Sequence, residues 1–394
     1  LSARKADSGR SIAADPAHGA DMRFRRDWAL VALAGSVIAA GPAAAQDLSA
    51  LEARVKALEN ASGQRVVQRS KKTMSLSLSG HVNRAIQFRD NGSESGVLHV
   101  TNNLSRTRVR WIGEGRINGD LTAGTLIELG NQSSISSRQD LGDNGDDDGP
   151  DVLDERQIEL TISSKTLGKL SLGQGDTASE DTAGADLSGT AMATVTGDPF
   201  LLAGGETLQV NGAPLGRTIR AVFDTFGGAG RRDRIRYDTP KFAGLTVSVS
   251  HHNGDSWDAG LHYGATIGGV KVAAGLGYAD DESRNDEKTF VGSLAVLLPM
   301  GLSFAIGGET HGKIGYRFHA FELGETRLAV EYSEVNDRAG VNERATYYGA
   351  GVVQVLEPLG AELYFSYHNA ELDLAGANDP DDIDIVTAGA RFKF

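Results

Sequence analysis

The chain has 394 residues, 50 glycines, no cysteine and a formal net charge of −13. The missing cysteine excludes disulfides, zinc thiolate sites and thiol nucleophiles, and the acidic balance argues against a nucleic-acid-binding protein, which needs a basic face toward phosphates. No apolar run reaches the roughly 20 residues of a membrane-spanning helix, so a membrane crossing would have to use strands.

The N-terminal region is expected to contain an export signal. Residues 1–21 show no periodicity and are interpreted as upstream sequence or an extended start that precedes the fold. Residues 22–45 combine a basic start, a short apolar run and an Ala-rich end, which is typical of a signal peptide. A buried N-terminal helix is the alternative.

Residues 46–72 are predicted to form a short helix followed by a basic linker. Apolar residues recur there at spacings of three and four, as in a heptad helix. A helix of roughly two heptads is too short to be stable alone, so association of several chains would help it. The alternative is a flexible leader with weak helicity. The apolar residues are Leu48, Leu51, Val55 and Leu58.

Residues 73–394 are predicted to form one all-β domain, a transmembrane antiparallel up-and-down β-barrel of about 16 strands. Apolar and polar side chains alternate in stretches of about ten residues between turn signals. Both chain ends must lie on one side of the barrel, so the strand number must be even, and residues 217–223 are assigned to a connection. The predicted strands are approximately residues 74–88, 106–117, 120–130, 154–163, 168–175, 231–239, 245–253, 258–266, 270–278, 289–298, 302–310, 314–322, 326–335, 344–356, 361–371 and 383–394.

Residues 176–230 form the longest predicted connection. A connection of this length in a compact fold is either functional or disordered. Its apolar part at residues 200–202 indicates that it is more than a solvated tail. Four carboxylates near its start are candidates to line a pore constriction: Asp176, Glu180, Asp181 and Asp186.

Two predicted strands carry arginines on the face opposite their apolar residues. Arginines on a lumen wall, facing carboxylates on a loop, produce a transverse field that orients polar solutes. The alternative is a structural role, in which the arginines pair with carboxylates and hold the loop against the wall, and both roles can coexist. The arginines are Arg106, Arg108, Arg110 and Arg116 on the second strand, and Arg232, Arg234 and Arg236 on the sixth.

Arg84 breaks the alternation of the first strand, because it falls among the outward-facing apolar residues. A charge at mid-membrane depth costs roughly 2–4 kcal/mol in lipid. The position is tolerable if this face contacts another subunit, so Arg84 is a candidate residue of a subunit interface.

One acidic segment nearly fits the spacing of a calcium-binding loop. Asn144, Asp146, Asp148 and Glu155 fall at ligand positions, but the first position is Asn, the seventh is Pro150, and no helices flank the segment. A solvated acidic outer loop is the alternative, and no other cofactor is expected. No Ser-His-Asp grouping or paired catalytic carboxylates are found, so the chain is not expected to be an enzyme.

The last strand alternates apolar and polar residues up to Phe394. Together with residues 173–190 and residues 234–240, it resembles the alphaproteobacterial outer-membrane porins, and the resemblance covers residues 74–394. It implies a homotrimer whose first strand lies at the subunit interface, contact with the lipid bilayer and lipopolysaccharide, a constriction loop at 176–230, and Phe394 as the signal for the barrel-assembly machinery.

The function implied by the resemblance is passive diffusion of small hydrophilic solutes and ions across the outer membrane. Two alternatives remain open: a solute-specific porin, and a plugged outer-membrane barrel that acts as a surface binding or adhesion protein. Single-channel conductance separates the plugged barrel from the two porins, and saturable transport separates the porins from each other.

Overall fold

The computed structural model describes residues 74–143, 153–195, 199–223, 227–281, 287–308, 310–338, 340–376 and 378–394. The predicted signal peptide, helix and linker lie outside these residues, as do three members of the calcium candidate, Asn144, Asp146 and Asp148. Within the described part of the chain, no helix is long and apolar enough to cross a membrane.

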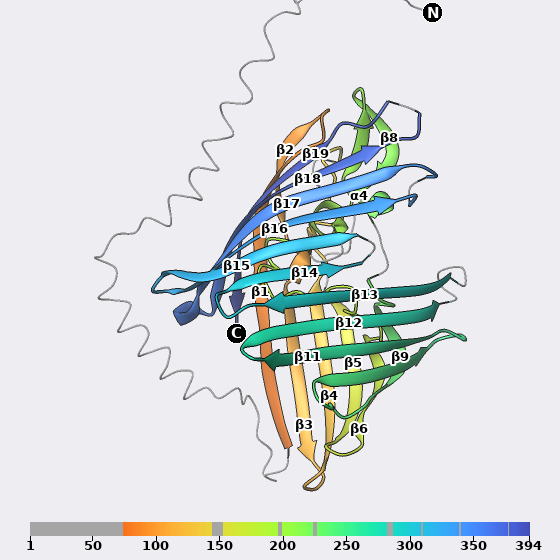
Figure 1. Ribbon diagram of the computed structural model, residues 1–394, viewed down its shortest axis with the longest axis vertical. Coiled ribbons are helices and arrows are strands. Elements are labelled where there is room, and N and C mark those ends of the chain that lie inside the picture. Colours follow the sequence, from red (N-terminus) through yellow and green to blue (C-terminus); the bar gives the residue numbers. More distant parts are fainter. Residues whose placement is uncertain are drawn as a thin grey trace, which may run out of the picture. The chain divides into compact units, whose positions relative to one another are not determined.

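The described residues form a closed antiparallel β-barrel with 16 strand positions in its wall, which confirms the predicted fold class (Figure 1). The barrel closes where β1 (Met74–Asp90) pairs with β19 (Ile383–Lys393). Between them the wall contains β2 (Ser95–Val100), β3 (Arg108–Arg116), β4 (Leu121–Asn131), β5 (Leu153–Ser164), β6 (Gly168–Asp176), β9 (Arg231–Asp238), β10 (Leu245–His252), β11 (Trp257–Ile267), β12 (Val270–Asp281), β13 (Glu287–Leu297), β14 (Leu302–Gly307), β15 (His311–Phe321), β16 (Gly324–Asn336), β17 (Arg344–Leu356) and β18 (Ala361–Asp373).

The second wall position is shared by two strands. β2 pairs with one half of β1 and β3 pairs with the other half, so the 17 strands of the sheet occupy 16 positions. At the break, the Thr107 hydroxyl accepts a hydrogen bond from the Asn83 backbone N–H at 2.9 Å. β2 was expected to be part of a long connection, which is wrong: it is a six-residue strand that follows a tight turn, too short to show a clear alternation.

The C-terminal residue completes the closure. Phe394 exchanges two backbone hydrogen bonds with Gly80 of β1, at 2.8 and 3.0 Å. A Cβ atom on Gly80 would lie 2.7 Å from the Phe394 ring, so the ring packs where Gly80 has no side chain. The terminal phenylalanine is therefore part of the wall.

The side chains of the wall are arranged inside out relative to a water-soluble protein. On β1, Val82, Arg84 and Ile86 are exposed on the outer face, whereas Asn83 and Gln87 are buried on the inner face. A lipid environment favours this distribution, because the apolar band faces hydrocarbon and the polar groups face the lumen. Arg84 therefore does lie on the outward face.

The connection between β6 and β9 leaves the wall. It contains α3 (Phe200–Ala203), α4 (Ile219–Phe223) and a separate two-stranded sheet of β7 (Thr207–Val210) and β8 (Ala213–Thr218). Residues 217–223 thus lie outside the wall, as predicted. We call residues 199–223 the internal segment, and Figure 1 shows it in green beside the ends of β16, β17 and β18.

The internal segment shares an apolar core with the inner face of the barrel. Phe223 is buried and its ring meets Tyr347 of β17 edge-on, with 5.8 Å between ring centroids. The internal segment contributes Phe200, Leu202, Ala203, Leu208, Ile219, Val222 and Phe223, and the wall contributes Val335, Ala345, Tyr347, Ala370, Leu372, Ile383 and Ile385.

A buried ion pair accompanies this core. Arg89 of β1 contacts Glu206 at 3.1 Å, and both side chains are fully buried. Two more of the guanidinium hydrogen bonds go to the backbone carbonyls of Ser136 and Gln139, each at 2.6 Å. A buried pair of this kind defines one docked position, because removing one partner leaves an uncompensated charge.

The core predicts that Phe223→Ala frees the internal segment. Truncating a buried phenylalanine costs about 3–5 kcal/mol, which raises the population of the undocked segment roughly 100-fold or more. Limited proteolysis followed by mass spectrometry should show correspondingly faster cleavage within residues 199–223. Phe242→Ala, at a turn residue that is 81% exposed, is the matched control. Equal cleavage of Phe223→Ala and the control would contradict the packed core.

Candidate functional site

One buried carboxylate organises the arginines of β3. The register places Arg110 opposite Glu128 of β4, and the two side chains form an ion pair. Arg108 lies 3.5 Å from the same carboxylate, and Arg156 of β5 lies 2.7 Å from it. Three guanidinium groups around one carboxylate leave this part of the wall with a net positive charge.

Arg156 was not among the predicted site residues. A β-bulge in β5 lies between the pairs Glu128–Gln157 and Leu129–Glu155, so Arg156 is the extra residue. A bulge inserts one residue and re-aims its side chain, which puts Arg156 on the inner face against the alternation. Nothing in the alternation of the sequence marks this position.

We call the connection between β6 and β9, residues 176–230, the folded-in loop. The arginines of β9 bind its start. Arg234 reaches across β6 to Glu159 of β5 at 2.5 Å and donates to the backbone carbonyl of Asp176 at 3.0 Å. Arg236 donates to the carbonyl of Thr177 at 2.6 Å. These contacts are the ones expected of the structural role, which can coexist with a role in permeation. Arg232 pairs with Asp281 at 3.4 Å and stays 41% exposed.

The four predicted loop carboxylates do not form one group. Asp176 pairs with Arg231 at 3.4 Å and is 37% exposed, and Asp181 is exposed. Glu180 is partly buried. Asp186 lies apart from them: it is largely buried and pairs with Lys313 of β15 at 3.0 Å. Its position differs from the expected one because the loop follows the inner wall from β10 to β15 before it reaches this residue.

Side chains of the wall also bind the loop backbone further along. Glu331 of β16 accepts from the N–H of Val195 at 3.0 Å, and Lys313 donates to the carbonyl of Val195 at 3.1 Å. Asp258 of β11 accepts from the N–H of Ser179 at 2.6 Å. The loop is thus bound to the inner wall at several successive strands.

Glycines of the wall lie directly beneath this loop. A Cβ atom on any of them would come within 3.0 Å of a loop atom, so only glycine allows the close approach. We call these six residues the glycine track. They are Gly260 on β11, Gly275 and Gly277 on β12, Gly307 on β14, Gly315 on β15 and Gly351 on β17.

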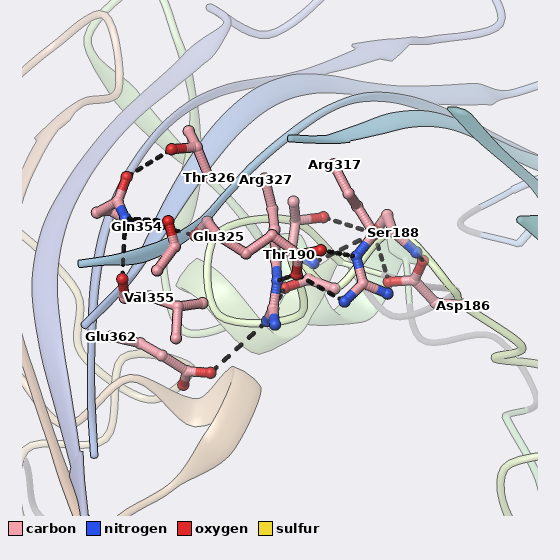
Figure 2. A network of polar contacts seen from close by, with 12 residues as sticks. Asp186, Ser188, Thr190, Arg317, Glu325, Thr326, Arg327, Gln354, Val355 and Glu362 are labelled. Carbon is pink, nitrogen blue, oxygen red and sulfur yellow. Dashed lines mark hydrogen bonds and ion pairs between the residues drawn. The ribbon is translucent and has the colours of Figure 1, made fainter. Parts of the chain in front are cut away.

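A second charged network, which was not predicted from the sequence, lies where the loop meets β15, β16 and β18. Figure 2 shows Arg317, Glu325, Arg327 and Glu362 together. Glu325 accepts from both arginines at 2.6 Å, and Arg327 lies 3.8 Å from Glu362. Arg327 also donates to the carbonyl of Gly189 at 3.2 Å. These charges come from three separate strands, so no single stretch of sequence displays them.

The remaining predicted residues have separate positions. Arg106 contacts Gln132 at 3.2 Å beside the break in the second wall position, and Arg116 is exposed near the turn after β3. Glu155 is exposed on β5. No group of three or more possible metal ligands occurs among the described residues. Because the other calcium candidates lie outside these residues, the calcium site stays a prediction.

Comparisons with known proteins agree with this architecture. A family model described as Gram-negative porin matches residues 29–394. The anion-selective porin of Comamonas acidovorans aligns with a TM-score of 0.52 at 16% identity, covering 82% of this chain and 100% of that one. OmpF of Salmonella typhi, in a complex with daunomycin, gives 0.53 at 14% identity, covering 81% and 98%.

A third solved structure is the trimer form of OmpT, an outer membrane protein of Vibrio cholerae. It aligns with a TM-score of 0.50 at 14% identity and covers 82% of this chain and 100% of that one. At these identities the likeness shows the fold alone. No curated protein matches the sequence.

The ion pair of Asp186 with Lys313 predicts a defined pH dependence. Burial opposes ionisation of Asp186, but the Lys313 ammonium and the hydrogen bonds from Ser188 outweigh it and lower the pKa of Asp186. A carboxyl whose pKa is lowered on folding stabilises the fold above its unfolded pKa of about 3.9, and loses that contribution as the pH falls through the folded value.

Asp186→Asn should therefore lower the unfolding temperature in detergent at neutral pH. The difference from the unsubstituted protein should persist down to about pH 4 and then shrink. The control is Glu322→Gln, at an exposed turn residue. A difference that grows toward low pH would reverse the sign and contradict the assigned pair.

Proposed function

The chain belongs to the Gram-negative porin family and is an outer-membrane channel protein, and on this premise we propose that it is a trimeric general-diffusion porin. Small hydrophilic solutes and ions cross it passively, and no chemical step takes place. The observation that carries the proposal is a barrel wall with water-accessible charges facing a loop bound inside the lumen. The resemblance of its terminal strand and loop to alphaproteobacterial porins favours a source in that group.

The passage runs along the wall from β3 to β9. On that side Arg110, Asp176 and Arg232 keep 37–41% of their side chains exposed. At the ends of β16–β19 the apolar core with the internal segment leaves the inward residues buried. Solute therefore passes beside the internal segment rather than through the centre of the barrel.

The charges along this passage set its selectivity. Exposed cations on β3 and β9 lie beside the carboxylates at the start of the loop, as the pair of Arg231 with Asp176 illustrates. Alternating charges of opposite sign in a narrow, low-dielectric channel orient dipolar solutes and retard apolar ones. Arg108, Arg110 and Arg232 are the wall cations in this proposal, and Asp176, Glu180 and Asp181 are the loop anions. Asp186 holds the loop and does not face the passage.

The apolar core also favours one of the alternatives. A segment that is fixed in the lumen by apolar packing and a buried ion pair is a feature of a plugged barrel. The partly exposed charges beside it argue for an open path, so we rank the plugged surface-binding barrel second. Measurable single-channel conductance in a planar bilayer excludes it.

The outward Arg84 supports the trimer. Its guanidinium donates to the Thr101 hydroxyl at 2.8 Å, beside the break between β2 and β3. An exposed guanidinium on a face that otherwise contacts lipid is stabilised when another subunit covers it. We propose that this face is the subunit interface, that the segment at 46–72 assists trimer formation, and that Phe394 is read by the assembly machinery after export.

Removal of loop charges tests the passage. Asp176→Asn combined with Asp181→Asn should shift the reversal potential toward anions under a salt gradient in a planar bilayer, because two carboxylates leave the passage. Glu94→Gln, at an exposed residue of the turn between β1 and β2, is the control and should leave the potential unchanged. An unchanged potential in the double variant would remove these residues from the pore.

A charge reversal at the outward face tests the trimer. Arg84→Glu should convert trimers into monomers on size-exclusion chromatography in detergent, while the conductance of single channels stays close to that of the unsubstituted protein. Lys241→Glu, at an exposed turn residue, should leave the trimer intact. Intact Arg84→Glu trimers with altered ion selectivity would place Arg84 in the pore instead.

A further inference from the structure

A recess opens on the inner wall below the start of the folded-in loop. It has a volume of about 200 Å³ and is formed by β5, β6 and β9. Lys169 and Ser171 of β6 lie in its middle, with Glu159 of β5 on one side and Arg236 and Asp238 of β9 on the other. The volume leaves room for a molecule of several non-hydrogen atoms.

The recess exists because β6 has small or absent side chains at several of its inward positions. Its inward positions are Lys169, Ser171, Gly173 and Gly175, so two of the four have no side chain. Their neighbours across the sheet are long: Gly173 lies between Glu159 and Arg234. Gly173 has φ 122°, and a Cβ there would lie 2.3 Å from the Ile158 carbonyl oxygen, so a larger residue cannot fill the space.

Most of the charged groups around the recess satisfy one another. Arg234 contacts Glu159 at 2.5 Å, with both side chains buried. Arg236 contacts Asp238 at 2.8 Å. These pairs form the rigid walls of the recess and have little capacity left for a solute.

One donor in the recess has no acceptor, and a second has only a distant one. The Ser171 hydroxyl is 1% exposed and has no hydrogen-bond partner among the described residues. The Lys169 ammonium is 43% exposed, and its nearest carboxylate oxygen, on Glu159, is 3.9 Å away, beyond hydrogen-bond distance. The two residues are two apart on one face of a strand, so their Cβ atoms lie about 6–7 Å apart. A buried hydroxyl without a partner is costly, and a bound acceptor removes that cost.

The charge of the surroundings selects an anion. The lining charges balance, but each of the three carboxylates is held by an arginine: Glu159 by Arg234, Asp238 by Arg236, and Asp176 by Arg231 outside the recess. Lys169 is therefore the lining cation whose charge is least compensated. A single negative charge on a solute pairs with this one ammonium group.

We propose that this recess is a binding site for a small monocarboxylate on its way through the channel. One carboxylate oxygen accepts from the Lys169 ammonium and the other from the Ser171 hydroxyl. The inference rests on the proposed function, because the solute reaches the recess along the passage beside β6. A weak site of this kind makes the flux of small monocarboxylates saturable, as in a solute-specific porin, while uncharged solutes of the same size cross by general diffusion without saturation.

The experiment uses the full-length trimer in planar bilayers, with acetate as the probe. Conductance of the unsubstituted protein should saturate as the concentration of potassium acetate rises. In Ser171→Ala and Lys169→Gln the half-saturating concentration should increase about tenfold, since each variant removes one hydrogen bond to a charged group. Lys165→Gln, at an exposed turn residue outside the recess, should behave like the unsubstituted protein.

The serine variant separates a binding site from a charge effect. Ser171→Ala changes no charge, so a long-range electrostatic role of Lys169 would leave its saturation curve intact, and that result would overturn the site. A linear acetate response of the unsubstituted protein, with normal conductance in potassium chloride, would also overturn it and leave the proposed function standing. Absence of conductance in potassium chloride would overturn the proposed function instead. In that case, NMR line broadening of ¹³C-acetate by the trimer in detergent still tests the site. Broadening that is present with the unsubstituted protein and lost in Ser171→Ala supports binding at the recess. No broadening with any form of the protein refutes the site.

Discussion

The structure depends on the need to pair every backbone N–H and C=O group that faces lipid. A strand in hydrocarbon has no water to bond, so the sheet must close on itself. β1 and β19 meet this need at the seam, and Phe394 extends the pairing to the last residue. Where the second wall position is interrupted between β2 and β3, the hydroxyl of Thr107 takes the place of the missing backbone partner.

Closure then decides where the polar side chains lie. With apolar residues on the lipid face, the charged residues gather inside, where each must find a partner. Glu128 does so with three arginines, and Arg89 with Glu206. Arg234, Arg236 and Lys313 use carbonyl groups of the loop. The folded-in loop therefore narrows the lumen, and its backbone carbonyl groups also accept hydrogen bonds from the cationic side chains of the wall.

The alternation of apolar and polar residues predicted the wall well. Odd and even positions along a strand point to opposite faces, and the face toward lipid is recognised by its apolar residues. This pattern placed Arg84 outside and Arg110 inside. The alternation failed to predict two features. The bulge in β5 shifts the inward and outward positions and turns Arg156 inward, and β2 is too short to show a pattern. The alternation also could not foresee that the loop would carry Asp186 to Lys313, since that pairing joins residues far apart in the chain. The helix at 46–72 and the calcium candidate lie outside the described residues and stay predictions.

The glycine track couples the position of the loop to the identity of the wall residues. The loop precedes β9, whereas the glycines that it contacts all lie on strands later in the chain: Gly260, Gly275, Gly277, Gly307, Gly315 and Gly351. A side chain at any of these positions would meet loop atoms and displace them toward the centre of the barrel. A substitution in the lipid-embedded wall can therefore alter the free cross-section of the channel without touching a charged residue.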